Sequence, residues 1–254
     1  MSAIFKIIYM SIRCKFFISV VHEFIYLLNA NPITVDDDDL WQRSGKFEGD
    51  MVLAPWQKNG VIDTALRWPN RNIPYEISHR FDEQKRAQIA EVLEREYAKT
   101  CITVKPRVNE SDYVYITGED TGCWSQVGRL GGRQELNLQT NGCVRNRTIV
   151  HEFLHAAGLY HQQSSIDRDD YVTIFWENIG EGHEHNFNKY SADFVSSFNE
   201  TYDYASIMHY GKKAFSSNGK PTILPKPDAT IPIGVTKVMS EIDIRKVNKM
   251  YECN

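Results

Sequence analysis

The sequence lacks several features that define whole classes of protein. Its 254 residues include only five cysteines and no C-x-x-C pair, which disfavours a zinc site built from thiolates. Lysine and arginine number 29 against 33 acidic residues, and no basic stripe stands out, so nucleic acid is not an expected partner. Internal repeats and long low-complexity tracts are also missing. The length suits one sizeable core with extensions.

Long apolar runs are absent except near the amino terminus. Basic residues precede two apolar runs, 16–21 and 24–28, and Asn29-Ala30 offers a small residue for cleavage. This order predicts a signal peptide over residues 1–30 and a secreted, extracellular protein, although His22-Glu23 interrupts the apolar run. A membrane anchor is the alternative. It is disfavoured because a spanning helix needs about 20 continuous apolar residues, and we expect no stable membrane association.

Cysteines and glycosylation sequons agree with export. Cys14 falls inside the leader. Four cysteines remain, which is an even number and allows three pairings; they are Cys101, Cys123, Cys143 and Cys253. Three N-x-S/T triplets are candidate glycosylation sites, although such triplets also occur by chance; they begin at Asn109, Asn146 and Asn199.

The most informative stretch runs from residue 151 to 161 and reads H-E-x-x-H-x-x-G-x-x-H. His151 and His155 share one face of a helix, so both can bind one metal ion. Gly158 allows the left-handed turn that ends the helix and brings His161 back to the same ion. Three imidazoles leave the fourth zinc position open for water, and Glu152 can accept a proton from that water.

The alternative interpretation is a buried helix that carries histidines by chance. A lone H-E-x-x-H is only suggestive, but the third histidine and the glycine make coincidence hard to accept. We therefore expect one catalytic zinc per chain.

Periodicity predicts the remaining elements coarsely. Asp82 is expected to cap a helix over 82–99, and a glycine-rich loop is expected over 118–132. The segment 68–77 is expected to turn and then enter a strand, and further strands are expected at 101–105, 113–116 and 135–138. Two further helices are expected at 148–157 and 240–250.

Three motifs together resemble the astacin family of zinc endopeptidases, a branch of the metzincins. They are residues 151–161, the following stretch 167–172 (D-R-D-D-Y-V) and the methionine turn 206–210 (S-I-M-H-Y). The resemblance covers roughly 47–253. It implies an α+β metzincin-type catalytic domain with two lobes. The N-terminal lobe holds a twisted sheet and two long helices, and the C-terminal lobe is loop-rich with a terminal helix.

The resemblance also implies roles for individual residues. Met208 forms an apolar floor beneath the metal, and Tyr210 is a switchable ligand whose phenol stabilises the transition-state oxyanion. His209 is interpreted as a residue beside the site whose hydrogen bonds are made with other protein groups and not with the metal. The family's disulfides correspond here to Cys101–Cys253 and Cys123–Cys143.

Activation is implied by two further matches. Phe47-Glu48-Gly49-Asp50 resembles the pro-segment motif in which an aspartate binds the zinc, so Asp50 is the expected zymogen ligand. Residues 68–75 match the start of the mature enzyme and place its terminus near Asn59. The expected organisation is a signal peptide 1–30, a pro-segment 31–58 removed by an activating protease, and a catalytic domain 59–254.

The chain departs from the family pattern at two places. Gln162 stands where a glutamate usually anchors the new amino terminus. Thr236 stands where some members carry an arginine that selects acidic residues after the scissile bond, and Lys237 is adjacent to it.

Protein or peptide substrates are expected to bind as an extended strand along an edge near residues 135–138. The competing hypotheses are a catalytically inactive relative that binds proteins and a membrane-tethered protease. Retention of all three histidines and Glu152 argues against the inactive relative.

Overall fold

The computed structural model describes residues 40–54, 64–192 and 195–253. The chain separates into two units, residues 1–36 and 37–254, and every described residue belongs to the second. The expected signal peptide and the expected mature terminus near Asn59 lie outside the described residues. Within the described ranges, no helix has the length and apolar character needed to cross a membrane.

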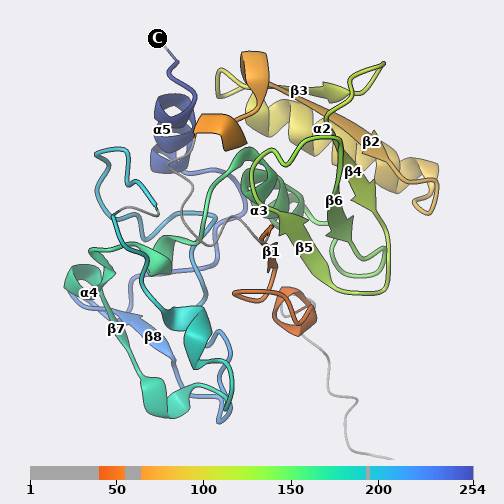
Figure 1. Cartoon of the computed structure of the whole chain (residues 1–254). Helices are drawn as coiled ribbons and strands as arrows, with labels where there is room; N and C mark the ends of the chain where they lie inside the picture. The colour runs from red at the N-terminus through yellow and green to blue at the C-terminus, as the bar shows by residue number, and fades with distance from the viewer. Residues whose placement is uncertain (1–39, 55–63, 193–194, 254) are drawn as a thin grey trace, which may run out of the picture. The chain divides into compact units, whose positions relative to one another are not determined.

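A six-stranded sheet is the main element of this unit (Figure 1). Its strands, in spatial order, are β1 (Met51–Val52), β5 (Cys123–Gln126), β6 (Arg133–Leu138), β4 (Tyr113–Thr117), β2 (Asn72–Ile77) and β3 (Thr103–Pro106). β5 runs antiparallel to β6, and every other neighbouring pair is parallel. The short strand β1, which follows the predicted pro-segment motif, therefore covers the outer edge of β5.

Two long helices pack against this sheet. Helix α2 (Glu83–Tyr97) begins where predicted, because the Asp82 side chain accepts a hydrogen bond from Lys85 N at 2.7 Å. Helix α3 (Asn146–Ala157) carries the first part of the histidine motif. Their apolar faces join the inward-facing strand residues in one core, which includes Ile73, Ile89, Leu93, Ile116, Leu136, Ile149 and Phe153. Burial of this face fixes the rotation of α3 and hence the direction of its polar side chains.

Two sequence-based expectations about this sheet are wrong. The segment 118–132 is not a continuous loop, because β5 forms within it. Substrate cannot add to residues 135–138 as an edge strand, because β6 is hydrogen-bonded to β4 on one side and to β5 on the other. The outer edge of β5 is instead paired with β1.

The C-terminal part has little regular structure. It contains α4 (Arg168–Tyr171), a two-stranded sheet of β7 (Val172–Ile174) and β8 (Ile223–Pro225), and the terminal helix α5 (Glu241–Met250). Ser240 and Asp243 form a reciprocal capping box at the start of α5. Short 3₁₀ turns complete the described chain: Trp41–Arg43, Thr64–Leu66, Pro69–Arg71, Gln162–Ser164, Trp176–Asn178 and Glu184–Phe187. The two-lobed α+β architecture that the sequence predicts is confirmed.

The disulfides connect these parts in the pairing that the resemblance implies. Cys101–Cys253 joins the chain end after α5 to the segment before β3, across a sequence separation of 152. Cys123–Cys143 joins β5 to the loop that precedes α3, with a separation of 20. In the chain-entropy view each contributes about 3–5 kcal/mol to stability.

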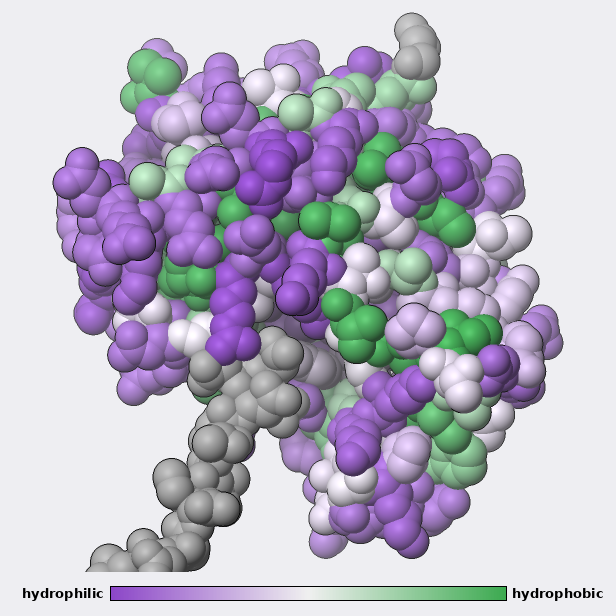
Figure 2. Space-filling model, turned by 180° about the vertical axis from the view of Figure 1, so that it is seen from behind, coloured by the Kyte–Doolittle hydropathy of each residue, from purple (hydrophilic) through white to green (hydrophobic). Residues whose placement is uncertain are grey.

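One face of the molecule is predominantly hydrophilic, with apolar residues in small separate groups (Figure 2). Large apolar side chains that are exposed in the described residues are scattered along the chain: Phe47, Val108, Ile166, Trp176, Val235 and Val238. Single exposed apolar residues are ordinary on a protein surface, so the cleft at the histidines is the more informative feature.

Candidate active site

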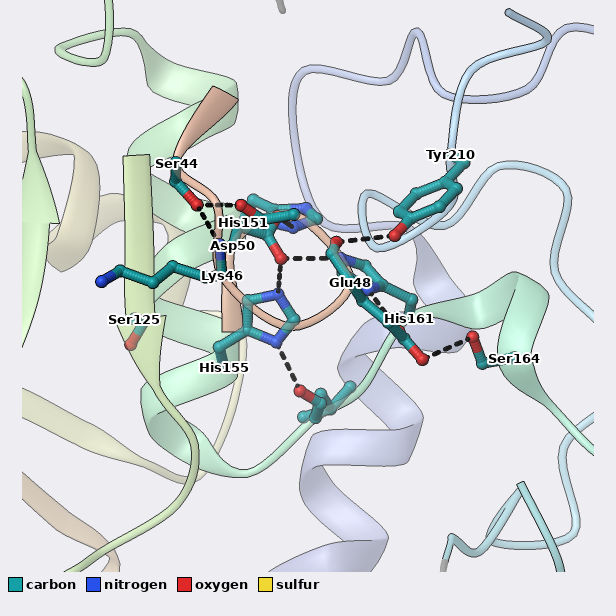
Figure 3. A network of polar contacts seen from close by, with 12 residues as sticks. Ser44, Lys46, Glu48, Asp50, Ser125, His151, His155, His161, Ser164 and Tyr210 are labelled. Carbon is teal, nitrogen blue, oxygen red and sulfur yellow. Dashed lines mark hydrogen bonds and ion pairs between the residues drawn. The ribbon is translucent and has the colours of Figure 1, made fainter. Parts of the chain in front are cut away.

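Helix α3 and the turn that follows it bring the three motif histidines together (Figure 3). The rings of His151 and His155 lie one helical turn apart, with centroids 4.8 Å from each other. Gly158 ends the helix with a φ of 115°, a left-handed conformation that favours glycine. The turn places the His161 ring 4.8 Å from His155 and 5.3 Å from His151.

Contacts between Nδ1 and a backbone carbonyl orient the rings of His151 and His155. His151 Nδ1 lies 2.9 Å from the Ile207 carbonyl, and His155 Nδ1 lies 2.8 Å from the Leu159 carbonyl. A carbonyl only accepts hydrogen bonds, so both Nδ1 atoms carry the proton and both Nε2 atoms present a lone pair. Supporting contacts of this kind fix metal-binding histidines in the correct tautomer.

The carboxylate of Asp50 lies among the three inward-facing nitrogens. Its oxygens are 3.1 Å from His151 Nε2, 3.4 Å from His155 Nε2 and 3.2 Å from His161 Nε2. The four ligand atoms all lie within 4.8 Å of one another. Asp50 itself is almost completely buried.

These residues fit a zinc ion. Asp50 Oδ1, His155 Nε2 and His161 Nε2 are buried and have no hydrogen-bond partner among the residues that the structure describes. Buried polar atoms normally have partners, so their convergence indicates a ligand at their centre. Three imidazole nitrogens and one carboxylate oxygen make a four-atom donor set of the kind that binds zinc.

Burial shapes the ionisation of the two acidic residues at this centre. Burial raises the pKa of Glu152 well above its usual range, and the nearby negative charge of Asp50 adds to the rise. Burial also acts to raise the pKa of Asp50, but His161 and His155 outweigh it and hold that pKa well below its usual range. Asp50 is therefore the ionised acid of the pair.

The pKa values of two of the histidines also shift in opposite directions. Burial lowers the pKa of His151 to about 4. Burial also acts against the charged form of His161, but the carboxylates of Asp50 and Glu48 outweigh it and raise the pKa to about 9. Metal binding needs neutral imidazoles, so a zinc ion would displace the proton from His161.

Glu152 and Tyr210 lie beside the histidine cluster. Both oxygens of the Glu152 carboxylate are buried without a hydrogen-bond partner among the described residues. The Tyr210 hydroxyl donates a hydrogen bond of 2.6 Å to the Glu48 carbonyl, and the Tyr210 ring lies 4.9 Å from Trp41. The segment 41–50 thus covers both groups, and they line one small cavity together with Asp50 and His151.

The methionine turn is held from two sides. Met208 is buried, and its carbonyl accepts a hydrogen bond of 3.0 Å from Gln162 N. The buried carboxylate of Asp243 on α5 accepts hydrogen bonds from Ser206 Oγ at 2.6 Å and Ile207 N at 2.9 Å. These contacts fix the turn that carries Tyr210.

Polar side chains near the turn have hydrogen-bond partners within the chain. His209 is buried between the Tyr202 hydroxyl, 2.7 Å from its Nε2, and the Tyr210 carbonyl, 2.8 Å from its Nδ1. Gln162 is also buried, and its side-chain oxygen accepts a hydrogen bond from Lys246 Nζ. The position after the third histidine therefore already has an amine partner from within the chain.

The remaining predicted residues lie at the surface. The three sequon asparagines are exposed: Asn109, Asn146 and Asn199. Lys237 is exposed, and the Thr236 carbonyl accepts a hydrogen bond of 3.1 Å from Arg147 Nε.

Sequence reasoning missed the polar partners of the buried Glu48. Its carboxylate contacts His161, Ser164 and Tyr190, which are far from it in the chain. The F-E-G-D motif draws attention to the aspartate, and no local pattern connects the glutamate to Tyr190. Arg147 was missed as well, although it lies one helical turn before His151 and lines the same cavity.

The chain is similar to known zinc metalloproteinases. The chain is 40% identical over 241 residues to zinc metalloproteinase nas-4 of Caenorhabditis elegans, covering 90% of this chain and 75% of that protein. It is 44% identical over 211 residues to human meprin A subunit beta, covering 82% of this chain but only 30% of that protein. The chain also spans less than half of nas-13 of Caenorhabditis elegans, at 43% of its length.

A solved structure and a family model complete the comparison. High choriolytic enzyme 1, a hatching enzyme zinc-protease from the medaka fish Oryzias latipes, matches with a TM-score of 0.71 and 40% identity. The match covers 76% of this chain and 97% of that one. Residues 60–252 match the family model for Astacin, which describes a peptidase family. The chain therefore belongs to the astacin family of zinc metalloendopeptidases.

Proposed function

We propose that this chain is a secreted zinc endopeptidase made as an inactive precursor. Residues 1–30 are its signal peptide, 31–58 its pro-segment and 59–254 its catalytic domain. The observation that carries the proposal is the carboxylate of Asp50, which lies 3.1–3.4 Å from the three histidine Nε2 atoms. A carboxylate in that position takes the place that the attacking water needs.

The cofactor is one zinc ion held by His151, His155 and His161. When bound, zinc supplies Lewis-acid polarisation of the scissile carbonyl and lowers the pKa of the nucleophilic water. The protein contributes the fixed ring orientations, which come from contacts to the Ile207 and Leu159 carbonyls.

Glu152 acts as the general base and then as the general acid. It takes a proton from the attacking water and passes that proton to the leaving amine. Its carboxylate is buried beside the cluster, with both oxygens unpaired among the described residues. The negative charge of Asp50 helps to raise the pKa of Glu152 in the precursor, and removal of the pro-segment removes that charge, which favours the carboxylate form that accepts the proton.

Tyr210 donates a hydrogen bond to the oxyanion of the transition state. Its hydroxyl is engaged by the Glu48 carbonyl. Release of the pro-segment frees that hydroxyl, and the buried Met208 would serve as the apolar floor of the metal site. The pro-segment thus blocks both the metal and the oxyanion donor.

Substrate binds as an extended strand on the outer edge of β5. In the precursor β1 occupies that edge, pairing Met51 with Ser125 and Val52 with Gln126. Removal of β1 by an activating protease exposes backbone donors and acceptors to which a protein or peptide strand can add. The exposed Asn109, Asn146 and Asn199 are available for glycosylation during secretion.

The test begins with the full chain expressed in a secreting host. The expected result is a precursor in the medium with a terminus beyond residue 30 and no activity towards a fluorogenic peptide. Limited proteolysis in the region of residue 59 should then produce activity that chelation abolishes and added zinc restores. Equal activity before and after processing would reject the precursor mechanism.

A further inference from the structure

The buried side chain of Glu48 lies beside His161 and Ser164 (Figure 3), and the space that it fills is called the Glu48 pocket. Its carboxylate is fully buried and accepts hydrogen bonds from His161 Nδ1 at 2.8 Å, from Ser164 Oγ at 3.2 Å and from the Tyr190 hydroxyl. Its negative charge also contributes, after burial, to raising the pKa of Tyr190 well above the usual range. Three donors thus converge on one acidic side chain.

The three donors belong to one part of the chain, residues 161–190, although Tyr160 and Tyr190 also pack in a cluster with Met51 and Leu53 of the pro-segment. Tyr190 N donates a hydrogen bond of 2.8 Å to the Ser164 carbonyl, and Ser164 N donates one of 3.3 Å to the His161 carbonyl. The Tyr190 ring packs edge-on against Tyr160, with centroids 5.2 Å apart. These contacts link the three donors to one another through residues that stay in the processed enzyme.

The backbone of Glu48 lies against Tyr210, which lines the small cavity beside the histidines. The Tyr210 hydroxyl donates a hydrogen bond of 2.6 Å to the Glu48 carbonyl. The backbone of Glu48 therefore lies beside Tyr210, while its side chain points to the three donors. Glu48 is two residues from Asp50, whose carboxylate lies at the metal position. A peptide backbone in this part of the cleft can therefore place one of its own side chains among the same donors.

We propose that His161, Ser164 and Tyr190 form a specificity subsite for an acidic side chain of the substrate, which Glu48 fills in the precursor. The inference rests on the proposed function, because the subsite opens only when the pro-segment is removed. A carboxylate can accept from all three donors, whereas a glutamine amide would bring its own N–H groups towards them. The pocket should therefore distinguish glutamate from glutamine, which have the same shape.

This subsite is separate from the segment at Thr236, where other members of the family carry an arginine. The Thr236 carbonyl is held by Arg147, on the first turn of α3, whereas Ser164 and Tyr190 belong to the segments after His161. The proposed acidic preference therefore does not rest on Thr236 or Lys237.

The first experiment uses a synthetic peptide of residues 40–54 and its Glu48→Gln form. Each peptide is titrated against the processed enzyme by fluorescence anisotropy, with zinc present and after zinc removal. The glutamine peptide should bind about 10-fold to 100-fold more weakly, the size expected for lost hydrogen bonds to a charged group. A preference for the glutamate peptide should also be present without zinc, because Ser164 and Tyr190 donate their hydrogen bonds independently of the metal.

Enzyme variants assign the effect to the pocket. In processed enzyme carrying Ser164→Ala and Tyr190→Phe, the penalty for Glu48→Gln should shrink by about tenfold. Tyr204→Phe is the matched control, since its hydroxyl donates to the Tyr171 carbonyl instead. Tyr204→Phe should leave the glutamate-to-glutamine ratio unchanged.

A peptide-library profile provides the substrate readout. One position should favour glutamate over glutamine, and the double variant should lose that preference while the remaining profile is kept. Equal binding of the two peptides to wild-type enzyme, or an unchanged penalty in the double variant, would overturn the subsite. Failure of the precursor mechanism would look different: the wild-type precursor would be active, and an Asp50→Asn peptide would bind as well as the unmodified one.

Discussion

Replacing Asp50 by alanine in the full-length precursor should produce activity without cleavage. Asp50 is the pro-segment group closest to the metal position, with oxygens 3.1 Å, 3.4 Å and 3.2 Å from the three Nε2 atoms. Alanine removes that ligand and leaves room for water beside Glu152. The substitution is on the pro-segment, so the residues proposed for catalysis stay intact.

The size of the effect follows from what remains of the pro-segment. Loss of a hydrogen-bonded charge costs about 1.5–3 kcal/mol, which corresponds to opening the cleft about 10-fold to 100-fold more often. Glu48 keeps its three partners, and β1 keeps its pairing with β5. The Asp50→Ala precursor should therefore exceed the wild-type precursor by about that factor and stay below the processed enzyme.

A fluorogenic peptide assay on purified precursors measures this directly, with mass spectrometry to show that the chain is uncleaved. Asp228→Ala, which removes an exposed carboxylate far along the chain, is the matched control. Asp50→Ala combined with Glu152→Ala shows whether any activity belongs to this enzyme. A folded, zinc-loaded Asp50→Ala precursor with no more activity than wild type would refute the reasoning.

Three further predictions concern the processed enzyme. Glu152→Ala should keep about one zinc per chain and lose activity by several orders of magnitude, because the base and the metal act as a unit; full activity in that variant would reject the mechanism. Tyr210→Phe should lower kcat by about 10²-fold, the effect of one lost oxyanion donor, with zinc content by mass spectrometry unchanged; loss of zinc would instead make it a structural ligand. Trimming one or two residues beyond Asn59 should cost little activity, because the uncharged Gln162 side chain already accepts a hydrogen bond from Lys246. A steep loss on trimming, measured on termini defined by sequencing, would restore the importance of the new terminus.

The helices and the histidine motif could be predicted from the sequence because their signals are local. Asp82 caps α2, and the apolar spacing that follows it gives the helix its buried face. Gly158 ends α3 with a positive φ. The spacing of the histidines on α3 needs only helical geometry to bring two of them to one ion.

Strand order could not be predicted, because pairing is decided by tertiary contacts. β5 is short and lies among glycines, and Gly122 and Gly128 on either side have positive φ. Its stability as a strand comes from pairing with β6 and β1, which no local pattern records. The wrong expectation that residues 135–138 form a free edge strand has the same cause, because strand pairing leaves no local pattern in the sequence.

The pocket of Glu48 was hidden for a related reason. Its donors are more than 100 positions away in the sequence, at separations of 113, 116 and 142 residues. A serine and a tyrosine in a loop-rich region carry no pattern of their own. Only the folded chain shows that both lie beside the third histidine.

The central claim is that Asp50 closes the zinc site of the precursor. The most direct measurement is a crystal structure of the wild-type precursor with an anomalous difference map recorded at the zinc edge. The account predicts one zinc ion with His151, His155, His161 and an oxygen of Asp50 as ligands, at about 2.0–2.2 Å. A zinc ion bound by the three histidines and water, with Asp50 turned away, would contradict it.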